Sequence, residues 1–256
     1  MNRTDLHHVA SKVPAVTLGF WVIKVLATTL GETGGDTLSM TLNLGYLIST
    51  VIFLAVLTGL VAGQIVATRF NRFLYWTTIV ASTTAGTTLA DFATRSLGIG
   101  YPGGSILLLA CVLASLMAWR LVLGAIDTDT VGTASAESFY WVTITFSQTL
   151  GTALGDWAAD TGGLGYAGAA VVFTLLLGGV AALYFWTGVS RTVLFWAAFI
   201  LTRPLGAAVG DFLDKPLDHG GLALSRPFAS GVLAMVIVTL ILVLPQRPGR
   251  HLAPAT

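Results

Sequence analysis

Charged residues are scarce in this chain of 256 residues, since Asp, Glu, Lys and Arg make up 10% and hydrophobic residues 55%. Soluble domains carry about 25% charged residues, so the ordinary soluble classes are excluded. The mean hydropathy is +0.82. Such a composition predicts a helical protein that crosses a membrane several times.

Excess charge, cysteine pairs and short alternating segments are also missing. A formal net charge of +1 gives no reason to expect a nucleic-acid partner. Cys111 is the only cysteine, which excludes an intrachain disulfide and a thiolate metal site. A transmembrane β-barrel needs alternating segments of about ten residues, whereas this chain has apolar runs of the length that helices need to span a lipid bilayer.

Four segments repeat one motif: FWVIKVLATTLGETGGD (20–36), YWTTIVASTTAGTTLAD (75–91), YWVTITFSQTLGTALGD (140–156) and FWAAFILTRPLGAAVGD (195–211). In each segment an aromatic residue precedes a Trp, a Gly follows ten residues after the Trp, and an Asp follows fifteen after it. Another glycine lies 24 residues after each Trp, at Gly45, Gly100, Gly165 and Gly220. The third and fourth units repeat the first and second at an offset of 120 residues. An internal repeat of this kind indicates a duplicated structural unit.

We therefore expect an all-α membrane protein of eight transmembrane helices, built from four parallel two-helix repeats. The motif helices are predicted at about 14–40, 73–95, 138–160 and 191–214. Plainer apolar helices are predicted at 46–67, 102–124, 166–188 and 226–245. Two tandem halves, 1–126 and 138–256, are joined by a polar loop over 127–137. The motif helices should lie inside and the plainer helices outside, facing lipid.

The basic residues indicate the orientation. Most fall on the side of the chain termini: Arg3, Lys12, Arg69, Arg72, Arg120, Arg191, Arg247 and Arg250. Arg95, Lys215 and Arg226 fall on the other side. The positive-inside rule then places both termini in the cytoplasm, with a multi-pass location in the inner (plasma) membrane, and the four motif Trp residues at the cytoplasmic interface.

The stretch LGETGGD, residues 30–36, places two carboxylates within an apolar run. An acid at the centre of a bilayer costs about 2.5–3.5 kcal/mol on insertion scales, so such acids are expected to have a function. If the motif helices meet, the motif acids converge and repel one another, and protons or a bound cation must relieve the repulsion. We expect an ion-binding site formed by Glu32, Asp36, Asp91, Asp156 and Asp211.

Other polar residues are candidates for an ion pathway or for gating: Lys24, Thr28, Thr84, Gln148, Thr149, Thr152, Asp160, Arg203 and Asp214. The hydroxyls can replace water on a passing ion or simply join helices by hydrogen bonds. Lys24 and Arg203 can act as internal counter-ions that close the site, or as fixed structural ion pairs. Small residues four apart predict close helix packing at Gly31, Gly35, Gly86, Gly151, Gly155, Gly206 and Gly210.

The repeated pattern and the segment KVPAVTLGFWVIKVLATTLGETGGDTLSM resemble a bacterial family of uncharacterised multi-spanning membrane proteins, which is defined by an internal repeat of unknown function. The resemblance covers about residues 12–245; only the second unit departs from it, with Ala90 in place of the glycine before the acid. It implies a repeated helical membrane fold and no particular activity.

The residues favour a secondary transporter or exporter of a small cation, either a divalent metal or a monovalent ion exchanged for protons. A small cation, protons, the lipid bilayer and a second copy of the chain are the expected partners. No cofactor is expected apart from a bound metal cation. An organic-substrate carrier or a membrane scaffold with structural aspartates is the alternative. An intramembrane enzyme is disfavoured because the acids lack the Gly-x-Gly-Asp and Tyr-Asp motifs of aspartyl proteases, and no His-Glu-x-x-His occurs.

Overall fold

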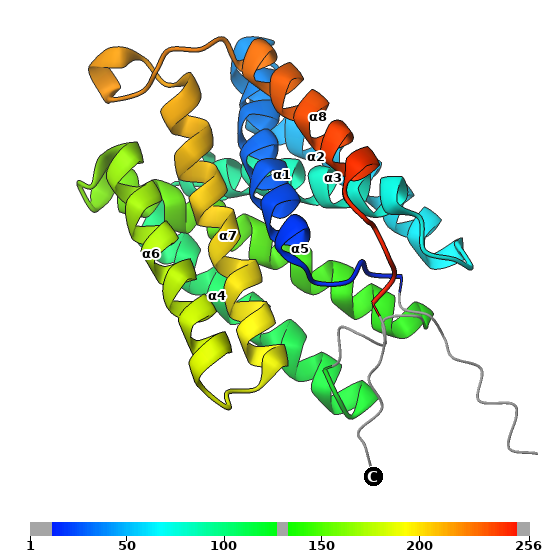
Figure 1. Ribbon diagram of the computed structural model, residues 1–256. Coiled ribbons are helices and arrows are strands. Elements are labelled where there is room, and N and C mark those ends of the chain that lie inside the picture. The colour runs from blue at the N-terminus through cyan, green and yellow to red at the C-terminus, as the bar shows by residue number, and fades with distance from the viewer. Residues whose placement is uncertain (1–11, 127–132, 250–256) are drawn as a thin grey trace, which may run out of the picture.

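A computed structural model describes residues 12–126 and 133–249 of the chain, and this part is helical (Figure 1). The motif helices are α1 (Leu18–Asp36), α3 (Arg72–Asp91), α5 (Ala134–Asp156) and α7 (Arg191–Asp214). The plainer helices are α2 (Gly45–Val66), α4 (Gly100–Leu123), α6 (Gly165–Trp186) and α8 (Arg226–Val243). The only β-type pairing in the described residues is an isolated bridge between Pro14 and Pro248.

Polar caps fix where the motif helices begin. The side chains of Thr17, Asn71 and Thr133 accept hydrogen bonds from backbone N–H groups in the first turns of α1, α3 and α5. Because Thr133 caps α5, that helix begins at Ala134, and the boundary expected at 138 was wrong. The predicted loop over 127–137 is therefore too long by its last four residues, and 127–132 lie outside the described residues.

The motif acids mark a change in helix geometry. Directly after Asp36, Asp91 and Asp156 the chain makes a five-residue π-helical turn, η1 (Thr37–Thr41), η2 (Phe92–Ser96) and η3 (Trp157–Thr161). The glycine 24 residues after each Trp then takes a positive φ, at Gly45 (73°), Gly100 (71°), Gly165 (64°) and Gly220 (80°). Glycine reaches this left-handed region without steric cost, so this part of the repeat has a conformational cause.

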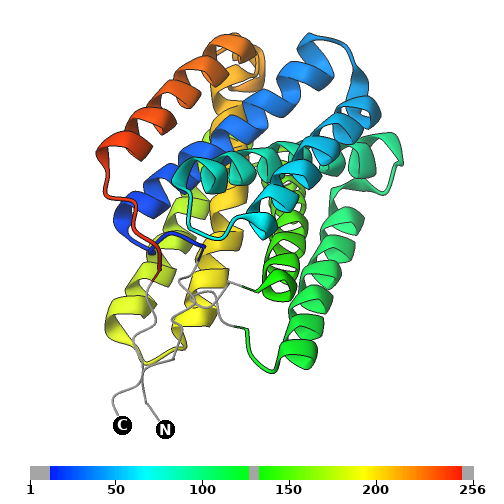
Figure 2. The ribbon, with the colours of Figure 1, turned by 90° about the vertical axis from the view of Figure 1, so that its right-hand side faces the viewer.

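The four motif helices form a closed ring. α1 packs against α3, α3 against α5, α5 against α7, and α7 against α1. The plainer helices pack outside this ring, with α2 on α3, α4 on α5, α6 on α7 and α8 on α1 (Figures 1 and 2). The structure thus has the motif helices inside and the plainer helices outside.

Aromatic side chains close one end of the ring, here called the Trp end. The aromatic residue before each Trp packs on a neighbouring unit's Trp, with ring centroids 5.4 Å apart for Phe20–Trp76, 5.8 Å for Tyr75–Trp141, 6.2 Å for Tyr140–Trp196 and 5.9 Å for Phe195–Trp21. The four helices therefore run parallel. Trp76, Trp141 and Trp196 are at most 5% exposed and pack between helices rather than outward, so their depth relative to a membrane interface stays a prediction.

Close contacts at glycines join the same neighbouring units, further along the motif helices. A Cβ on Gly31, Gly86, Gly151 or Gly206 would collide with a neighbouring unit's residue seven positions after its Trp: Thr83, Gln148, Arg203 and Thr28, respectively. The other small residues of the motif, Gly35, Gly155 and Gly210, also face a neighbouring motif helix at 3.0 Å or less. Small residues let helix backbones approach closely, and here they do so at all four contacts of the ring.

Five helices, α2, α4, α6, α7 and α8, are long and apolar enough to cross a membrane. This indicates a membrane protein. Helices α1, α3 and α5 do not reach the same apolarity because they carry polar side chains, many of which are buried in the interior of the ring.

Candidate functional site

Polar side chains stack along the interior of the ring, from the aromatic residues at the Trp end to the four motif aspartates at the opposite end, here called the Asp end. The Trp end is sealed by buried Phe20, Tyr75, Tyr140 and Phe195, with the hydroxyls of the two tyrosines 2.8 Å apart. The next layers belong to the positions three, seven and eleven residues after each Trp. Three- and four-residue spacing keeps these positions on one helix face.

Lys24 lies just above the aromatic residues and is fully buried. Its Nζ lies 4.1 Å from the centroid of the Phe199 ring and donates to Oε1 of Gln148 at 3.5 Å. Among the described residues, no carboxylate forms an ion pair with it. The structure therefore gives Lys24 a cation–π contact and a weak hydrogen bond, but no structural ion pair.

Arg203 crosses the centre of the ring and is also fully buried. Its Nη2 lies 2.8 Å from Oε2 of Glu32 and donates to the hydroxyls of Thr87 and Thr152. These three acceptors are the residues eleven positions after the Trp in the first three units. One side chain of the fourth unit thus joins all four motif helices. Arg203 is thus paired with a carboxylate, which is compatible with both a gating counter-ion and a fixed structural ion pair.

At the Asp end the four motif aspartates are 1–3% exposed and separate into two pairs, each bridged by a basic residue. Nζ of Lys215 lies 2.8 Å from Oδ2 of Asp36 and 2.9 Å from Oδ1 of Asp211. Arg95 lies 2.9 Å from Oδ1 of Asp91 through Nε and 3.3 Å from Oδ2 of Asp156 through Nη2. The chain itself thus provides basic partners for the motif aspartates. The sequence alone had indicated protons or a bound cation in that role.

The sequence contains a signal for these bridges that we missed. Arg95 and Lys215 each follow a motif aspartate by four residues and lie 120 positions apart, so they are equivalent in the two halves. Residues four apart are neighbours on a helix, so the pairs Asp91–Arg95 and Asp211–Lys215 were predictable. The second acid of each bridge belongs to another unit, and only the ring brings it into reach.

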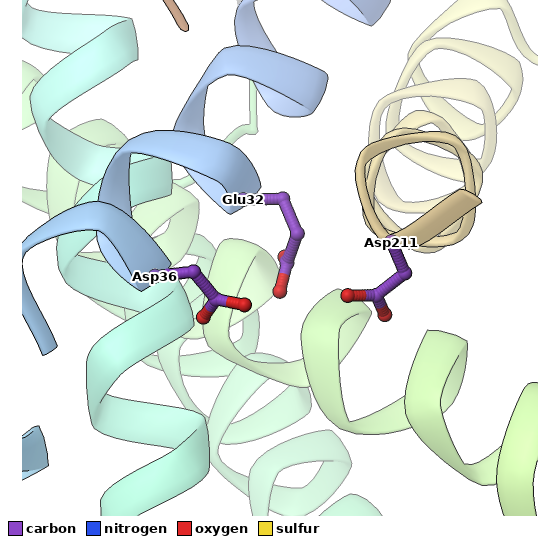
Figure 3. A group of neighbouring side chains, drawn as sticks. All are labelled: Glu32, Asp36 and Asp211. Atoms are coloured by element: carbon purple, nitrogen blue, oxygen red, sulfur yellow. The ribbon is translucent and has the colours of Figure 1, made fainter. Parts of the chain in front are cut away.

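Three carboxylates gather beside Lys215. Each of Glu32, Asp36 and Asp211 offers an oxygen within 4.8 Å of those of the other two, and all three residues are buried. Figure 3 shows Glu32 and Asp36 extending from α1 toward Asp211 on α7. Oδ1 of Asp36 is buried without a hydrogen-bond partner. We call these three residues the carboxylate triad.

Further basic and acidic groups surround the triad. Nε of Arg226 lies 2.8 Å from Oδ2 of Asp214 and 3.7 Å from Oδ2 of Asp36. Lys215 follows the last residue of α7. Burial disfavours its charged form, but Asp211, Asp36 and Asp214 outweigh this and raise the pKa of Lys215 above its usual value. Lys215 is therefore an ammonium at neutral pH.

A pocket of about 430 Å³ lies at the Asp end, and Arg95, Lys215 and Arg226 form part of its wall. The residues four positions after each motif aspartate all line it, namely Met40, Arg95, Asp160 and Lys215, and its remaining lining residues are Tyr166, Pro216, His219 and Arg226. Asp160 accepts a hydrogen bond from the hydroxyl of Tyr101 at 3.2 Å. The bridged aspartates therefore lie next to a pocket at the Asp end.

The other predicted pathway residues have local roles. The hydroxyls of Thr84 and Thr149 donate to carbonyls one turn earlier in their own helices, at 2.7 and 2.9 Å. The hydroxyl of Thr28 lies 2.8 Å from the carbonyl oxygen of Val25 in its own helix and 3.1 Å from that of Thr202, and the second contact joins α1 to α7. Of these three hydroxyls, only that of Thr28 joins two helices, whereas those of Thr84 and Thr149 bond within their own helices.

Comparison with known proteins agrees with the repeat. No curated protein and no solved structure matches the chain. A family described as a repeat of unknown function (DUF347) matches it four times, over residues 19–70, 74–123, 139–190 and 194–246. These segments cover nearly the whole chain and coincide with the four units that form the ring, so the protein belongs to this repeat family of unknown function.

Proposed function

We propose that this protein is a secondary transporter or exporter of a small cation in a bacterial inner membrane, where all eight helices span the bilayer and both termini are cytoplasmic. The observation that carries the proposal is the buried carboxylate triad of Glu32, Asp36 and Asp211 beside the pocket at the Asp end. Carboxylate oxygens are the ligands that hard cations prefer. The protein has no catalytic role in this proposal.

The balance of charge at the Asp end supports cation binding. Six buried carboxylates lie there or one layer below: Glu32, Asp36, Asp91, Asp156, Asp211 and Asp214. Four basic side chains form ion pairs with them: Arg95, Arg203, Lys215 and Arg226. Negative charge is therefore in excess where the dielectric constant is low, and a bound cation or protons relieve it.

The closed Trp end favours a carrier over an open channel. Below the triad, Arg203 occupies the centre of the ring, and the aromatic residues seal it beyond Lys24. An ion that enters from the Asp end must wait for these layers to rearrange before it leaves at the other end. Alternating access of this kind is the usual mechanism of secondary transporters built from repeats.

The ring also supports the proposal that the more polar motif helices span the bilayer. Their acids and bases face one another inside the ring, and the plainer helices cover the outside. Charged residues of spanning helices usually face a bundle interior and pair there.

Single substitutions of Asp36 and Asp211 by Asn test the proposal. We expect either change to abolish cation flux into reconstituted vesicles, measured with Mn²⁺ and separately with Na⁺ against a proton gradient, because each removes a charged ligand of the triad. Asp218→Asn is the matched control, since its side chain is 80% exposed in the loop after α7. Normal flux in the Asp36 and Asp211 variants would contradict the proposal.

A carrier of an organic substrate or a scaffold remains the second candidate, because every motif aspartate is held in an ion pair. In that case the acids hold the ring together. The Asn variants would then lose yield and thermal stability, and vesicles with wild-type protein would carry neither ion.

A further inference from the structure

Lys215 has the position that a bound cation would take. Its ammonium is 2.8 Å from Asp36 and 2.9 Å from Asp211, two of the three members of the carboxylate triad. The third member, Glu32, is engaged by Arg203 from the opposite direction. An ammonium that bridges two carboxylates makes the same kind of electrostatic contact as a metal ion between them.

Building on the transport proposed above, we propose that Lys215 is a tethered counter-ion that fills the triad when no substrate is bound, and that the substrate which displaces it is a hard divalent cation. Binding then exchanges one positive group for another. The triad is closed by Lys215 in the ion-free protein and filled by the metal in the loaded protein.

The charge of the competing groups favours a divalent substrate. A monovalent ion brings the same charge as the ammonium, which is also held in place by the chain, so it gains no Coulomb energy by the exchange. A divalent ion brings twice the charge to the same carboxylates. Oδ1 of Asp36, which has no hydrogen-bond partner, provides a ligand that Lys215 leaves unused.

The displaced ammonium has a place to go. Lys215 lies between the end of α7 and Pro216, has an extended backbone with ψ 152°, and lines the pocket at the Asp end. Asp160 lines the same pocket, and no ion pair within the described ranges uses its carboxylate. Lys215 therefore moves from a buried pair of acids to an acid in the pocket.

The bridge made by Arg95 is equivalent but has no third carboxylate at the position of Glu32, so it is a matched control. Arg95 joins Asp91 and Asp156, but Thr87 and Thr152 stand where the first unit has Glu32. Two carboxylates held by a guanidinium offer fewer ligands than the triad. Arg95 is therefore a fixed structural bridge, and only the bridge made by Lys215 exchanges its cation.

The test measures Mn²⁺ binding to the purified full-length protein by calorimetry and by the Mn²⁺ electron paramagnetic resonance signal. We expect Lys215→Gln to tighten Mn²⁺ binding by about tenfold or more, because the site no longer has to expel its own counter-ion. Arg95→Gln should leave the Mn²⁺ affinity near the wild-type value. Excess Na⁺ should not displace Mn²⁺ from the wild-type protein.

Lys215→Arg keeps the positive charge, so it tests the proposal even if Lys215→Gln fails to fold. We expect it to weaken Mn²⁺ binding, because a bidentate guanidinium holds the acids more firmly. Suppose that the wild-type protein binds Mn²⁺ and that Asp36→Asn abolishes this binding. An unchanged Mn²⁺ affinity in a folded Lys215→Gln or Lys215→Arg protein would then overturn only the role of Lys215. Flux of Na⁺ without Mn²⁺ binding would overturn the divalent substrate and leave cation transport standing. Absence of both binding and flux would overturn the proposed function itself.

Discussion

Two fully buried basic residues in the ring, Lys24 and Arg203, differ in what they touch. Arg203 has a carboxylate and two hydroxyls around one nitrogen, whereas Lys24 has an aromatic face and an amide oxygen. Removing one partner of a buried ion pair leaves an uncompensated charge, which typically costs about 3–5 kcal/mol. Removing a buried cation that has no carboxylate partner leaves no such charge. Removal of these two buried cations should therefore have opposite effects on the free energy of unfolding.

We expect Arg203→Met to lower the thermal midpoint of the protein in detergent strongly, because it leaves Glu32 buried and unpaired. Adding Glu32→Gln to that variant should recover much of the loss, since the double change removes both charges together. Lys24→Met is the matched control and should leave the midpoint unchanged or raise it. Equal losses in Arg203→Met and Lys24→Met would contradict this assignment.

At the level of single helices, the repeated glycines set how closely the ring can pack. Gly206 on α7 lies against Thr28 on α1, where a Cβ would come within 2.8 Å of the Thr28 carbonyl carbon. Gly178 on the outer helix α6 has no neighbouring atom within 4 Å of a built Cβ. The same amino acid thus closes a helix contact in one place and only lowers helix propensity in the other.

Gly206→Ala should destabilise the protein, because a backbone atom cannot move aside as a flexible side chain does; overpacking a close contact typically costs about 1–3 kcal/mol. Gly178→Ala should be neutral or stabilising by up to about 1 kcal/mol, the usual helix propensity difference. Thermal unfolding of both variants in the same detergent measures the difference. A Gly206→Ala protein as stable as Gly178→Ala would show that α1 and α7 do not pack as described.

Much of each helix was predictable because its determinants are local. The Trp-to-Asp spacing indicates the motif helices, and Arg191–Asp214 has the predicted bounds. The start of α5 was missed because the capping by Thr133 was overlooked. The Lys215 bridge to Asp36 depends on residues 179 positions apart, and the Arg203 contacts join three other helices. Such contacts depend on how the four motif helices close into a ring, and no local sequence pattern predicts that.

The whole molecule combines a fourfold arrangement of helices with a twofold arrangement of charges. Aromatic and glycine contacts recur four times around the ring. Basic bridges occur only in the second and fourth units, 120 residues apart. Two duplications account for this: the first produced the helical scaffold, and the second copied a unit pair that already carried a basic residue after its second acid. Glu32 occurs in the first unit alone, which is why the carboxylate triad forms beside only one of the two bridges, the one made by Lys215.

Because the four motif helices run parallel, the two ends of the ring should face opposite sides of the membrane. All four aspartates and the pocket lie at one end. Apart from Lys24 and Arg203 inside the ring, the described basic residues outside that end lie near the helix ends at the other: Lys12, Arg69, Arg72, Arg120, Arg191 and Arg247. The positive-inside rule therefore predicts that the Asp end faces away from the cytoplasm. Substrate would then enter or leave the triad from outside the cell membrane.

Single cysteines introduced into a Cys111→Ser background test this orientation. In cells whose outer barrier is made permeable but whose inner membrane is intact, we expect Asp218→Cys to react with a membrane-impermeant maleimide, since it lies in the exposed loop at the Asp end. Ser190→Cys, exposed before α7 at the Trp end, should react only after the inner membrane is disrupted. The two sites flank one helix, so equal labelling in intact membranes would mean that α7 does not cross the bilayer. Reversed labelling would be consistent with the ring but would place the triad on the cytoplasmic side. The pocket would then receive its cation from inside the cell.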